Sequence, residues 1–433
     1  MKNLAGKKLL LIGGAFQHRK VVEAAKALGV TVYVTDYLPV EKAPAKEIAD
    51  KYYMHNITDI DEIVEMCREE KIDGVLATHL DACQLPYQQV CERLGLPCFG
   101  SAEQFRYLTD KKSFKKICIE NGVDVIPSYT PADFETEEIC SERVTFPVLI
   151  KPGMSRGSRG QTICSEYSEV KSAIEFALSE SGNGEVVIER YMGRNNDFSI
   201  TALVINGEIY LERTCDRVLG AVEDHMDKSA IASINPSVFT SMYEEKVHEK
   251  VVKLIKAMGL KNAPVFMQGF VDGDTVRFYD PGLRFPGIDY ERNVVGVYGK
   301  NPINAYIEYA LTGEITDDYS WLSDSVRLDG KAAIALFIPI RPGKIASISG
   351  VEEISKHPAV TAYFQKYHVG DEIGAYYNVN QRFCEIDLLC ESKKAMADII
   401  DNMYETLKID DENGESMIIS KLNTDCLRQA EEV

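Results

Sequence analysis

The stretch that decides the fold reads Phe146-Pro-Val-Leu-Ile-Lys151-Pro-Gly-Met-Ser-Arg-Gly-Ser-Arg159-Gly160. Its apolar residues predict a buried strand that ends at Lys151, and a loop with three glycines follows. Such a loop can wrap backbone amides around phosphates, while Lys151 supplies a point charge and Arg159 a forked one. It is not a Walker loop, because no Gly-Lys-Ser/Thr opens a helix. The pattern favours a phosphate site, and a surface hairpin with solvated charges remains the alternative.

A polar linker between two predicted strands is the second candidate element, Glu189-Arg190-Tyr191-Met192-Gly-Arg-Asn-Asn-Asp197. An extended linker offers main-chain donors and acceptors to the edge of an adenine ring. The carboxylates of Glu189 and Asp197 can take an amino group or ribose hydroxyls. Taken alone, this pattern is a weak indication of a nucleotide site.

The third element is a predicted hairpin, from Pro264 to Asp280, with Asp272-Gly-Asp-Thr at its turn. Gln268 stands on one strand and Asp280 at the end of the other, and Arg284 follows. Oxygen-bearing side chains that meet across a hairpin beside an arginine suit a hard cation and the phosphates it bridges. A polar cross-strand pair without a ligand is an equally good interpretation of this element alone.

Lysine, glycine loop, linker and hairpin in this order resemble the ATP-grasp superfamily over nearly the whole chain. The similarity is to its carboxylate-amine ligase branch and extends to L-amino-acid ligases, biotin carboxylase and the carbamoyl-phosphate synthase large chain. Thr109-Asp110-Lys111-Lys112 resembles the family's segment with the first phosphate-binding lysine, and Lys151 matches the second. The resemblance assigns ATP binding to Lys111, Lys151, Gly157, Ser158, Arg159, Gly160, Glu189, Arg190, Tyr191, Met192 and Asp197, the metal to Gln268 and Asp280, and catalysis to Arg284 and Lys151.

The resemblance implies an ATP-dependent ligase that uses Mg²⁺, or alternatively Mn²⁺. A carboxylate oxygen attacks the γ-phosphate to give an acyl phosphate, and an amine then displaces phosphate to form a C–N bond. Lys111, Lys151 and Arg284 would neutralise the transferring charge. The implied partners are a small carboxylate and a small amine, and a homodimer is compatible with this interpretation.

The chain departs from the family pattern at three positions. The first metal position, normally Glu, is Gln268, and the second is the shorter Asp280. The Asn two residues later in the family is Gly282 here. A neutral amide oxygen still coordinates Mg²⁺, but the lost charge weakens the attraction for the ion. Two alternatives therefore stay open: a biotin-carboxylase-like or carbamoyl-phosphate-forming enzyme, and a catalytically degenerate nucleotide-binding sensor.

Three stretches of different pattern predict the domain organisation. Residues 1–108 alternate apolar strands with helical patterns, which predicts an N-terminal parallel sheet of the α/β class. Residues 109–315 hold the suggestive motifs, with a mobile lid over about residues 122–191. The acidic segment near 316–324 precedes an α+β closing domain over residues 316–433. Together these stretches predict an ATP-grasp fold flanked by a preceding α/β domain and a closing α+β domain.

Composition excludes several other classes of protein. The chain has 433 residues and a net charge of −19, so a nucleic-acid surface of clustered Lys and Arg is not expected. The longest apolar run, 332–340, contains Pro339 and is far shorter than the roughly 18 residues of a membrane span. Eleven cysteines without a Cys-x-x-Cys pair indicate reduced thiols. We therefore expect a soluble cytoplasmic protein that holds anionic ligands in a local basic pocket.

Two features of the N-terminal stretch invite separate hypotheses. Gly13-Gly14 after the first strand and Asp36 after the second suggest a dinucleotide site, but the third glycine of that fingerprint is absent. A tight strand-to-helix turn is the better interpretation. The segment Thr78-His79-Leu80-Asp81 is the best candidate for part of the acceptor pocket, and helix capping by Asp81 is its alternative.

Overall fold

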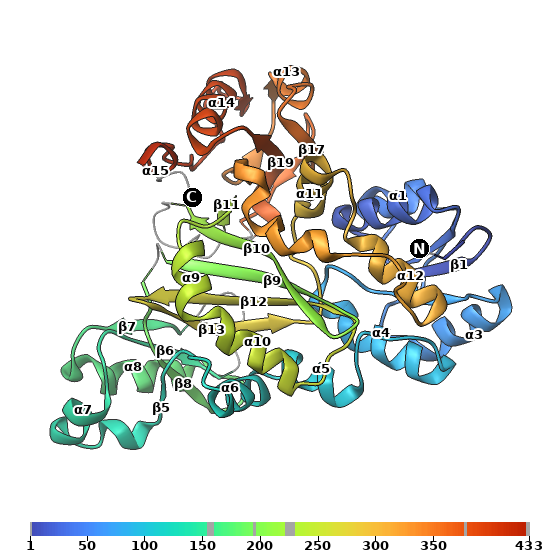
Figure 1. Ribbon diagram of the computed structural model, residues 1–433. Helices are drawn as coiled ribbons and strands as arrows, with labels where there is room; N and C mark the ends of the chain where they lie inside the picture. The colour runs from blue at the N-terminus through green and yellow to red at the C-terminus, as the bar shows by residue number, and fades with distance from the viewer. Residues whose placement is uncertain (1, 154–159, 194–195, 221–229, 376–378, 430–433) are drawn as a thin grey trace.

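The computed structural model describes residues 2–153, 160–193, 196–220, 230–375 and 379–429, and the three largest of its five sheets organise the fold. A parallel sheet lies in the N-terminal part, a small antiparallel sheet lies in the lid region, and a long antiparallel sheet joins the centre to the C-terminal part (Figure 1). The two smaller sheets lie at different ends of the long one (Figure 1). The candidate site is built where the three regions approach one another.

The N-terminal sheet has the strand order β3-β2-β1-β4, with all its pairs parallel. Strand β1 is buried almost throughout, as its run of four apolar residues predicts. At Gly13, with φ of 99°, an added Cβ would lie 2.7 Å from the His18 ring, so the turn after β1 is tight. The elements are β1 Lys8–Ile12, η1 Phe16–His18, α1 Arg19–Ala27, β2 Thr31–Thr35, η2 Val40–Lys42, α2 Ala45–Ile48, β3 Lys51–Tyr53, α3 Ile60–Glu70, β4 Gly74–Leu76, α4 Asp81–Leu94, α5 Ala102–Thr109 and α6 Lys111–Glu120.

The lid region forms a sheet of its own, with the order β5-β8-β6-β7. It also has its own small apolar core, which includes Val148, Ile150, Val170 and Ile188. A separate sheet and a separate core are what a lid needs in order to move as a unit. Its elements are β5 Ser128–Tyr129, η3 Pro131–Phe134, α7 Glu137–Arg143, β6 Val148–Pro152, β7 Thr162–Cys164, α8 Tyr167–Ser179 and β8 Val186–Arg190.

The long sheet has eight strands in the order β13-β12-β9-β10-β11-β14-β19-β17. Its first part comprises β9 Asp197–Ile205, β10 Glu208–Leu219, β11 Ala230–Asn235, α9 Thr240–Lys246, α10 His248–Ala257, β12 Ala263–Asp272, β13 Thr275–Gly282, α11 Tyr290–Tyr298, α12 Ile303–Thr312 and η4 Ser320–Gly330. The C-terminal region comprises β14 Ala332–Pro339, β15 Gly343–Lys344, β16 Ser347–Ser349, α13 Val351–Ser355, β17 Val360–Gln365, β18 Glu372–Ile373, η5 Val379–Gln381, β19 Arg382–Cys390, α14 Lys393–Thr406, β20 Lys408–Asp410 and α15 Asp425–Gln429. In this region β15 pairs with β18 and β16 with β20, as two further two-stranded sheets. Since β11 pairs with β14, the closing region shares a sheet with the central region.

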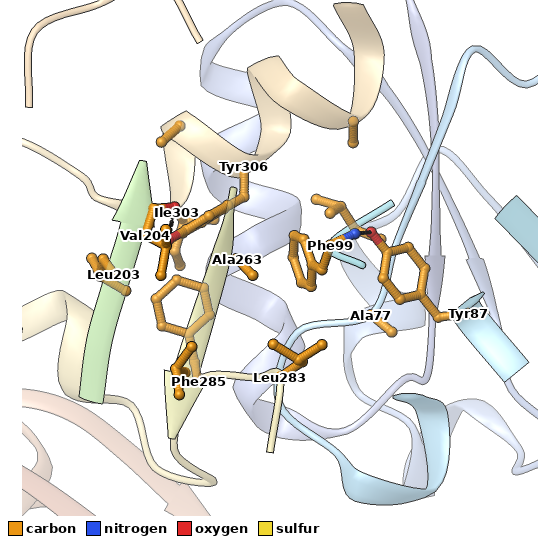
Figure 2. Packing of buried hydrophobic residues seen from close by; sticks show 14 of the residues in the cluster. Ala77, Tyr87, Phe99, Leu203, Val204, Ala263, Leu283, Phe285, Ile303 and Tyr306 are labelled. Carbon is orange, nitrogen blue, oxygen red and sulfur yellow. Dashed lines mark hydrogen bonds between the residues drawn. The ribbon is translucent and has the colours of Figure 1, made fainter. Parts of the chain in front are cut away.

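Aromatic side chains connect the N-terminal part to the central sheet (Figure 2). The rings of Phe99 and Tyr306 meet edge to face at 5.4 Å, and Tyr306 meets Phe285 in the same way at 5.6 Å. The Tyr306 hydroxyl donates to the carbonyl of Val204 on β9, and that of Tyr87 accepts from the Phe99 amide. One continuous core therefore holds the N-terminal part against the strands that carry the site.

The predicted fold is confirmed, with an N-terminal parallel sheet and antiparallel C-terminal strands accompanied by helices. The strand–helix alternation expected from residues 8 to 94 appears in the expected order. Within the described residues, every helix is too short or too polar to cross a membrane. The domain boundaries drawn from the sequence remain predictions, and the shared sheet places no break in strand pairing at residue 316.

Candidate active site

A row of polar side chains crosses one end of the long sheet, on strands β13, β12 and β9. Asp280 on β13 is the cross-strand partner of Gln268 on β12, and Gln268 is in turn paired with Ser199 on β9. Asp197 lies two residues before Ser199 and therefore shares its face of the strand. The sheet thus brings the two predicted metal ligands together, with Asp197 next to them.

Asp197 is almost fully buried, and each of its carboxylate oxygens has a partner. The amide nitrogen of Gln268 donates to Oδ1 at 2.8 Å, and Arg217 on β10 donates to Oδ2 at 2.7 Å. Burial raises the pKa of Asp197, although the Arg217 charge and the Gln268 hydrogen bond oppose that shift. Asp197, which we expected beside the ribose, therefore contacts Gln268, one of the two predicted metal ligands.

Lys111 approaches Asp280 from the first turn of α6. The Asp110 carboxylate caps this helix by accepting from the Ser113 amide at 2.8 Å. This cap fixes the start of the helix, where Lys111 is the first residue. The Lys111 ammonium lies 3.9 Å from Asp280, and its side chain is 74% exposed, so it is free to turn toward a ligand. Burial raises the pKa of Asp280, and Lys111 opposes the shift.

A pocket of about 660 Å³ opens beside Lys111 and Asp280. Its walls come from the start of α3, from α4, from the turn between α5 and α6, and from the end of β13. The lining residues are Thr58, Ile60, Asp81, Ala82, Gln84, Leu85, Pro86, Gln89, Leu108, Thr109, Lys111, Asp280 and Pro281. Carboxylates, a cation and apolar side chains therefore face one space between the N-terminal and central regions.

Arg284 is held at this pocket by a residue of the N-terminal part. Its guanidinium forms a two-pronged ion pair with Asp81, at 2.5 and 3.0 Å, and lies over the Phe266 ring. Gln84 donates to the same carboxylate and accepts from the Leu283 amide. Asp81 is the first residue of α4 and Leu80 is its N-cap, so Asp81 orients Arg284 rather than capping the helix.

Gly282 lies against this arrangement, at the position where the family pattern has Asn. A Cβ added there would lie 3.0 Å from Cγ of Arg284 and 3.3 Å from Nε2 of Gln84. At these distances a larger residue would press against the Arg284 side chain, whereas glycine fits without displacing it. The departure at Gly282 is therefore coupled to the packing of Arg284.

On the lid side, Lys151 donates to Glu189 at 2.7 Å, and Lys115 of α6 donates to its other oxygen at 2.6 Å. Burial alone would raise the pKa of Glu189, but Lys151 and Lys115 hold it below its usual value. Glu189 is thus an ionised carboxylate between two lysines. The predicted phosphate-binding and adenine-binding elements meet at this group of three.

The linker after β8 connects the lid to the central sheet. Arg190 forms a bidentate ion pair with Asp272 of the β12–β13 turn, at 2.8 and 3.3 Å, and the Tyr191 amide donates to the Pro147 carbonyl. Met192 follows and is half-buried. Gly160 lies at the end of the loop with φ of 73°, whereas Gly157, Ser158 and Arg159 lie outside the described residues.

Behind Arg284, a buried charged group joins the N-terminal part to the start of α11. Lys20 of α1 contacts Asp289, Glu291 and the carbonyl of Ile288. His79 stacks on Phe285 and lies 3.6 Å from Glu291. Burial lowers the pKa of His79 to about 4. This group fixes the segment that carries Arg284.

The sequence motifs did not single out Asp81 as the partner of Arg284, nor Lys115, Arg217 or Lys20. Each of these residues acts through a partner far along the chain, so no local spacing marks it. Buried lysines are rare, but the helical face that contains Lys20 showed only an ordinary amphipathic pattern. Asp81 was recognised as a pocket candidate, without its partner.

The described residues contain no group of three or more His, Cys, Asp or Glu arranged to hold a metal ion. Gln268 and Asp280 nevertheless fit Mg²⁺ as a pair of oxygen donors, because they face one another across two strands. The remaining ligands of an octahedral shell would have to be phosphate oxygens and water. The residues present therefore fit a metal that is held jointly with a phosphorylated ligand.

Two family models match the chain. Residues 110–278 match the carbamoyl-phosphate synthase L chain, ATP binding domain, and residues 9–85 match the PylC-like, N-terminal domain. These ranges contain Lys111, Lys151, Glu189 and Gln268 in the first model, and the segment from β1 to Asp81 in the second. Asp280 and Arg284 follow immediately after the first range.

Curated relatives and solved structures agree with these models. A formate-dependent phosphoribosylglycinamide formyltransferase of Haloquadratum walsbyi is 29% identical over 196 residues, 44% of this chain and 48% of the relative. The chain spans about half the length of the first curated relatives it matches. A phosphoribosylglycinamide synthetase from Anaerococcus prevotii superposes with a TM-score of 0.76 at 18% identity, over 94% of this chain and 100% of the other. An L-amino acid ligase from Bacillus licheniformis gives 0.71 and 18% over the same shares, and this likeness is one of fold.

Proposed function

Because this chain belongs to the ATP-grasp superfamily, we propose that it is an ADP-producing ligase that joins a carboxylate to an amine. A carboxylate oxygen of the first substrate attacks the γ-phosphorus of ATP, the bond to the ADP oxygen breaks, and an acyl phosphate forms. The amine nitrogen then attacks the acyl carbon, phosphate leaves with the C–O bond pair, and the nitrogen loses a proton. Both substrates are small molecules.

The observation that carries this proposal is that four cations from separate parts of the chain are each paired with a carboxylate, and that Lys111 and Asp280 line a pocket. Lys111, Arg217 and Arg284 each lie beside a carboxylate on or near the long sheet. Lys151, in the predicted lid, is paired with Glu189. Phosphoryl transfer needs charge neutralisation and positioning more than covalent help from the protein, and this arrangement supplies both. A surface hairpin with solvated charges would not gather cations from three regions.

ATP would place its phosphates between the lid and the long sheet. Lys151 would leave Glu189 to bind a phosphate oxygen, while Lys115 would keep Glu189 ionised and in place beside the adenine linker of residues 189–192. Mg²⁺, or Mn²⁺ in its place, would supply positive charge near the reacting group. Gln268 and Asp280 would hold it.

The acceptor pocket would be the space between α4 and α6 next to Asp280. Arg284 is paired with the lining residue Asp81, and a carboxylate bound in the pocket would lie close to Lys111. The pocket lining is mixed, with apolar Ile60, Leu85 and others beside the charged groups. This supports a substrate whose carboxylate is carried on a partly apolar body.

We place the protein in the cytoplasm, because the cysteines among the described residues are free and mostly buried, as expected in a reducing compartment. Assembly into a homodimer is compatible with the proposed reaction. Size-exclusion chromatography with light scattering would measure the oligomeric state.

The direct test is ADP release with panels of carboxylates and amines. Turnover should require one member of each panel together with ATP and a divalent ion. ADP release with bicarbonate in place of the carboxylate panel would instead favour the carboxylase-like or carbamoyl-phosphate-forming alternative. ATP binding without turnover on any pair would favour the nucleotide sensor.

A second measurement tests the ATP site itself. Lys111→Ala and Lys151→Ala each remove a charged partner of the phosphates, an interaction worth roughly 1.5–3 kcal/mol. Affinity for ATP by calorimetry should fall about tenfold or more in each variant. Unchanged affinity in both variants would contradict the site.

A further inference from the structure

The hydrogen bond between Gln268 and Asp197 determines which way the Gln268 amide faces. A carboxylate can only accept hydrogen bonds, so the atom of Gln268 that lies 2.8 Å from Asp197 must be its nitrogen. The amide oxygen is the other branch of the same planar group. It is therefore left for the opposite side, where Asp280 is the cross-strand neighbour.

The surroundings of Asp197 hold its carboxylate in place. Its second oxygen is held by Arg217 at 2.7 Å, and its side chain is 2% exposed. The hydroxyl of Tyr279 also interacts with Gln268. A hydroxyl can donate or accept, so Tyr279 accommodates either amide orientation, whereas Asp197 permits only one.

We propose that Asp197 is a positioning residue of the metal site, which holds the oxygen of Gln268 toward the ion beside Asp280. The inference rests on the proposed function, since it concerns the Mg²⁺ that accompanies ATP. The carboxylate that position 268 lacks, compared with the family pattern, is present one strand away at position 197. The Gln268 amide and the Asp197 carboxylate form a matched pair, so changing either residue alone should weaken metal binding.

The test is a charge swap in four full-length proteins: wild type, Gln268→Glu, Asp197→Asn, and the double variant that carries both changes. Mn²⁺ affinity is measured by electron paramagnetic resonance with saturating ADP. ADP affinity without metal and the melting temperature are measured alongside, so that loss of fold or of nucleotide binding is recognised. Tyr279→Phe is the matched control, because it removes a different polar neighbour of Gln268 and leaves Asp197 in place.

Gln268→Glu should weaken Mn²⁺ binding about tenfold although it adds a negative charge, because two carboxylates would then face one another. Asp197→Asn should also weaken it, because an amide partner allows Gln268 to turn over. The double variant should return to wild-type affinity or better, and Tyr279→Phe should change affinity less than twofold, about the margin of such a measurement.

Three results would overturn the inference while leaving the ATP site standing. They are tighter Mn²⁺ binding in Gln268→Glu alone, losses that simply add in the double variant, and a loss in Tyr279→Phe equal to that in Asp197→Asn. If wild type bound no Mn²⁺ in the presence of ADP, the proposed function itself would fail, and the inference with it.

Discussion

At the scale of single residues, the departures from the family pattern are explained by neighbours that are distant in sequence. Gln268 stands opposite Asp197, and Gly282 lies under the side chain of Arg284. These two departures each have a complementary partner. The active-site residues are therefore coupled, and a substitution toward the family pattern is expected to disturb the partner rather than improve the site.

Gly282→Ala tests this coupling at Arg284. The added methyl group would contact Cγ and Nε of Arg284 at 3.0 and 3.2 Å and should push the guanidinium away from Asp81. We expect turnover to fall about tenfold or more while ATP affinity is nearly unchanged, because a lost charge-assisted contact is worth roughly 1.5–3 kcal/mol. Gly287→Ala, in the loop that follows β13, is the matched control, since a Cβ there has no neighbour within 4 Å. Equal kinetics in the two variants would contradict the coupling.

His79 gives the site a pH dependence that can be measured as stability. Burial holds the pKa of His79 at about 4, below its ordinary value of 6.5, so the folded protein keeps the ring neutral while the unfolded chain binds a proton more readily. The contribution of His79 to the free energy of unfolding is complete above pH 6.5 and is lost as the pH falls toward 4. At about 1.4 kcal/mol per pKa unit, the total loss is about 3 kcal/mol.

The corresponding measurement is the free energy of unfolding of wild type and His79→Gln at several pH values. The difference between the two proteins should shrink as the pH falls from 6.5 to 4. The comparison cancels other titrating groups such as Glu385, whose pKa burial raises to about 7 and whose contribution runs in the opposite direction. A difference that is constant with pH would show that His79 does not stay neutral in the folded state.

At the scale of elements, local patterns were sufficient wherever a segment is stabilised by its own periodicity. Strand β6 and the hairpin of β12 and β13 lie where the sequence pattern predicted them. The pairing of β11 with β14 could not be predicted, because no local pattern specifies which strand edges meet. The same limit applies to the site: Lys111 and Lys151 follow recognisable motifs, whereas the pair of Asp81 with Arg284 depends on tertiary packing alone.

The lid is the element whose motion is most directly testable. Lys151 on β6 and Lys115 on α6 share Glu189, so a phosphate that attracts Lys151 must break one of these two contacts. We expect hydrogen exchange in β6, β7 and β8 to slow when an ATP analogue and Mg²⁺ are added, since ligand contacts stabilise a unit with a small core of its own. Strand β1 serves as the internal control. Exchange in the lid that the analogue leaves unaltered would contradict closure.

At the scale of the whole molecule, the acidic composition and the site are consistent with one another. A chain with a net charge of −19 has to bind an anionic substrate through local cations. In the structure, Arg217, Arg284 and Lys151 are each paired with a carboxylate, so the site is close to neutral before any ligand binds. ATP phosphates must therefore compete with protein carboxylates, and lid closure is the movement that could favour the phosphates.

The docking of the N-terminal part onto the central sheet should depend on the buried lysine at its interface. Lys20 is 4% exposed and contacts Asp289 and Glu291, which are each 1% exposed. Lys20→Met would keep most of the apolar stem but leave two buried carboxylates without this cation. Breaking a buried ion pair on one side costs about 3–5 kcal/mol, since the remaining charge is uncompensated. Asp289 and Glu291 belong to the segment that carries Arg284, so turnover should fall as well.

The matched control is Lys26→Met on the same helix, where the ion pair with Asp50 is 42% and 37% exposed and should contribute only about 0–1 kcal/mol. Urea unfolding would give both free energies. Lys20→Met combined with Glu291→Gln should recover part of the loss, since the second change removes one uncompensated charge, while Asp289 keeps its pair with Arg292. If Lys20→Met were no more destabilising than Lys26→Met, the buried group would not be what holds the N-terminal part in register with Arg284, and the shared aromatic core around Tyr306 would have to do so alone.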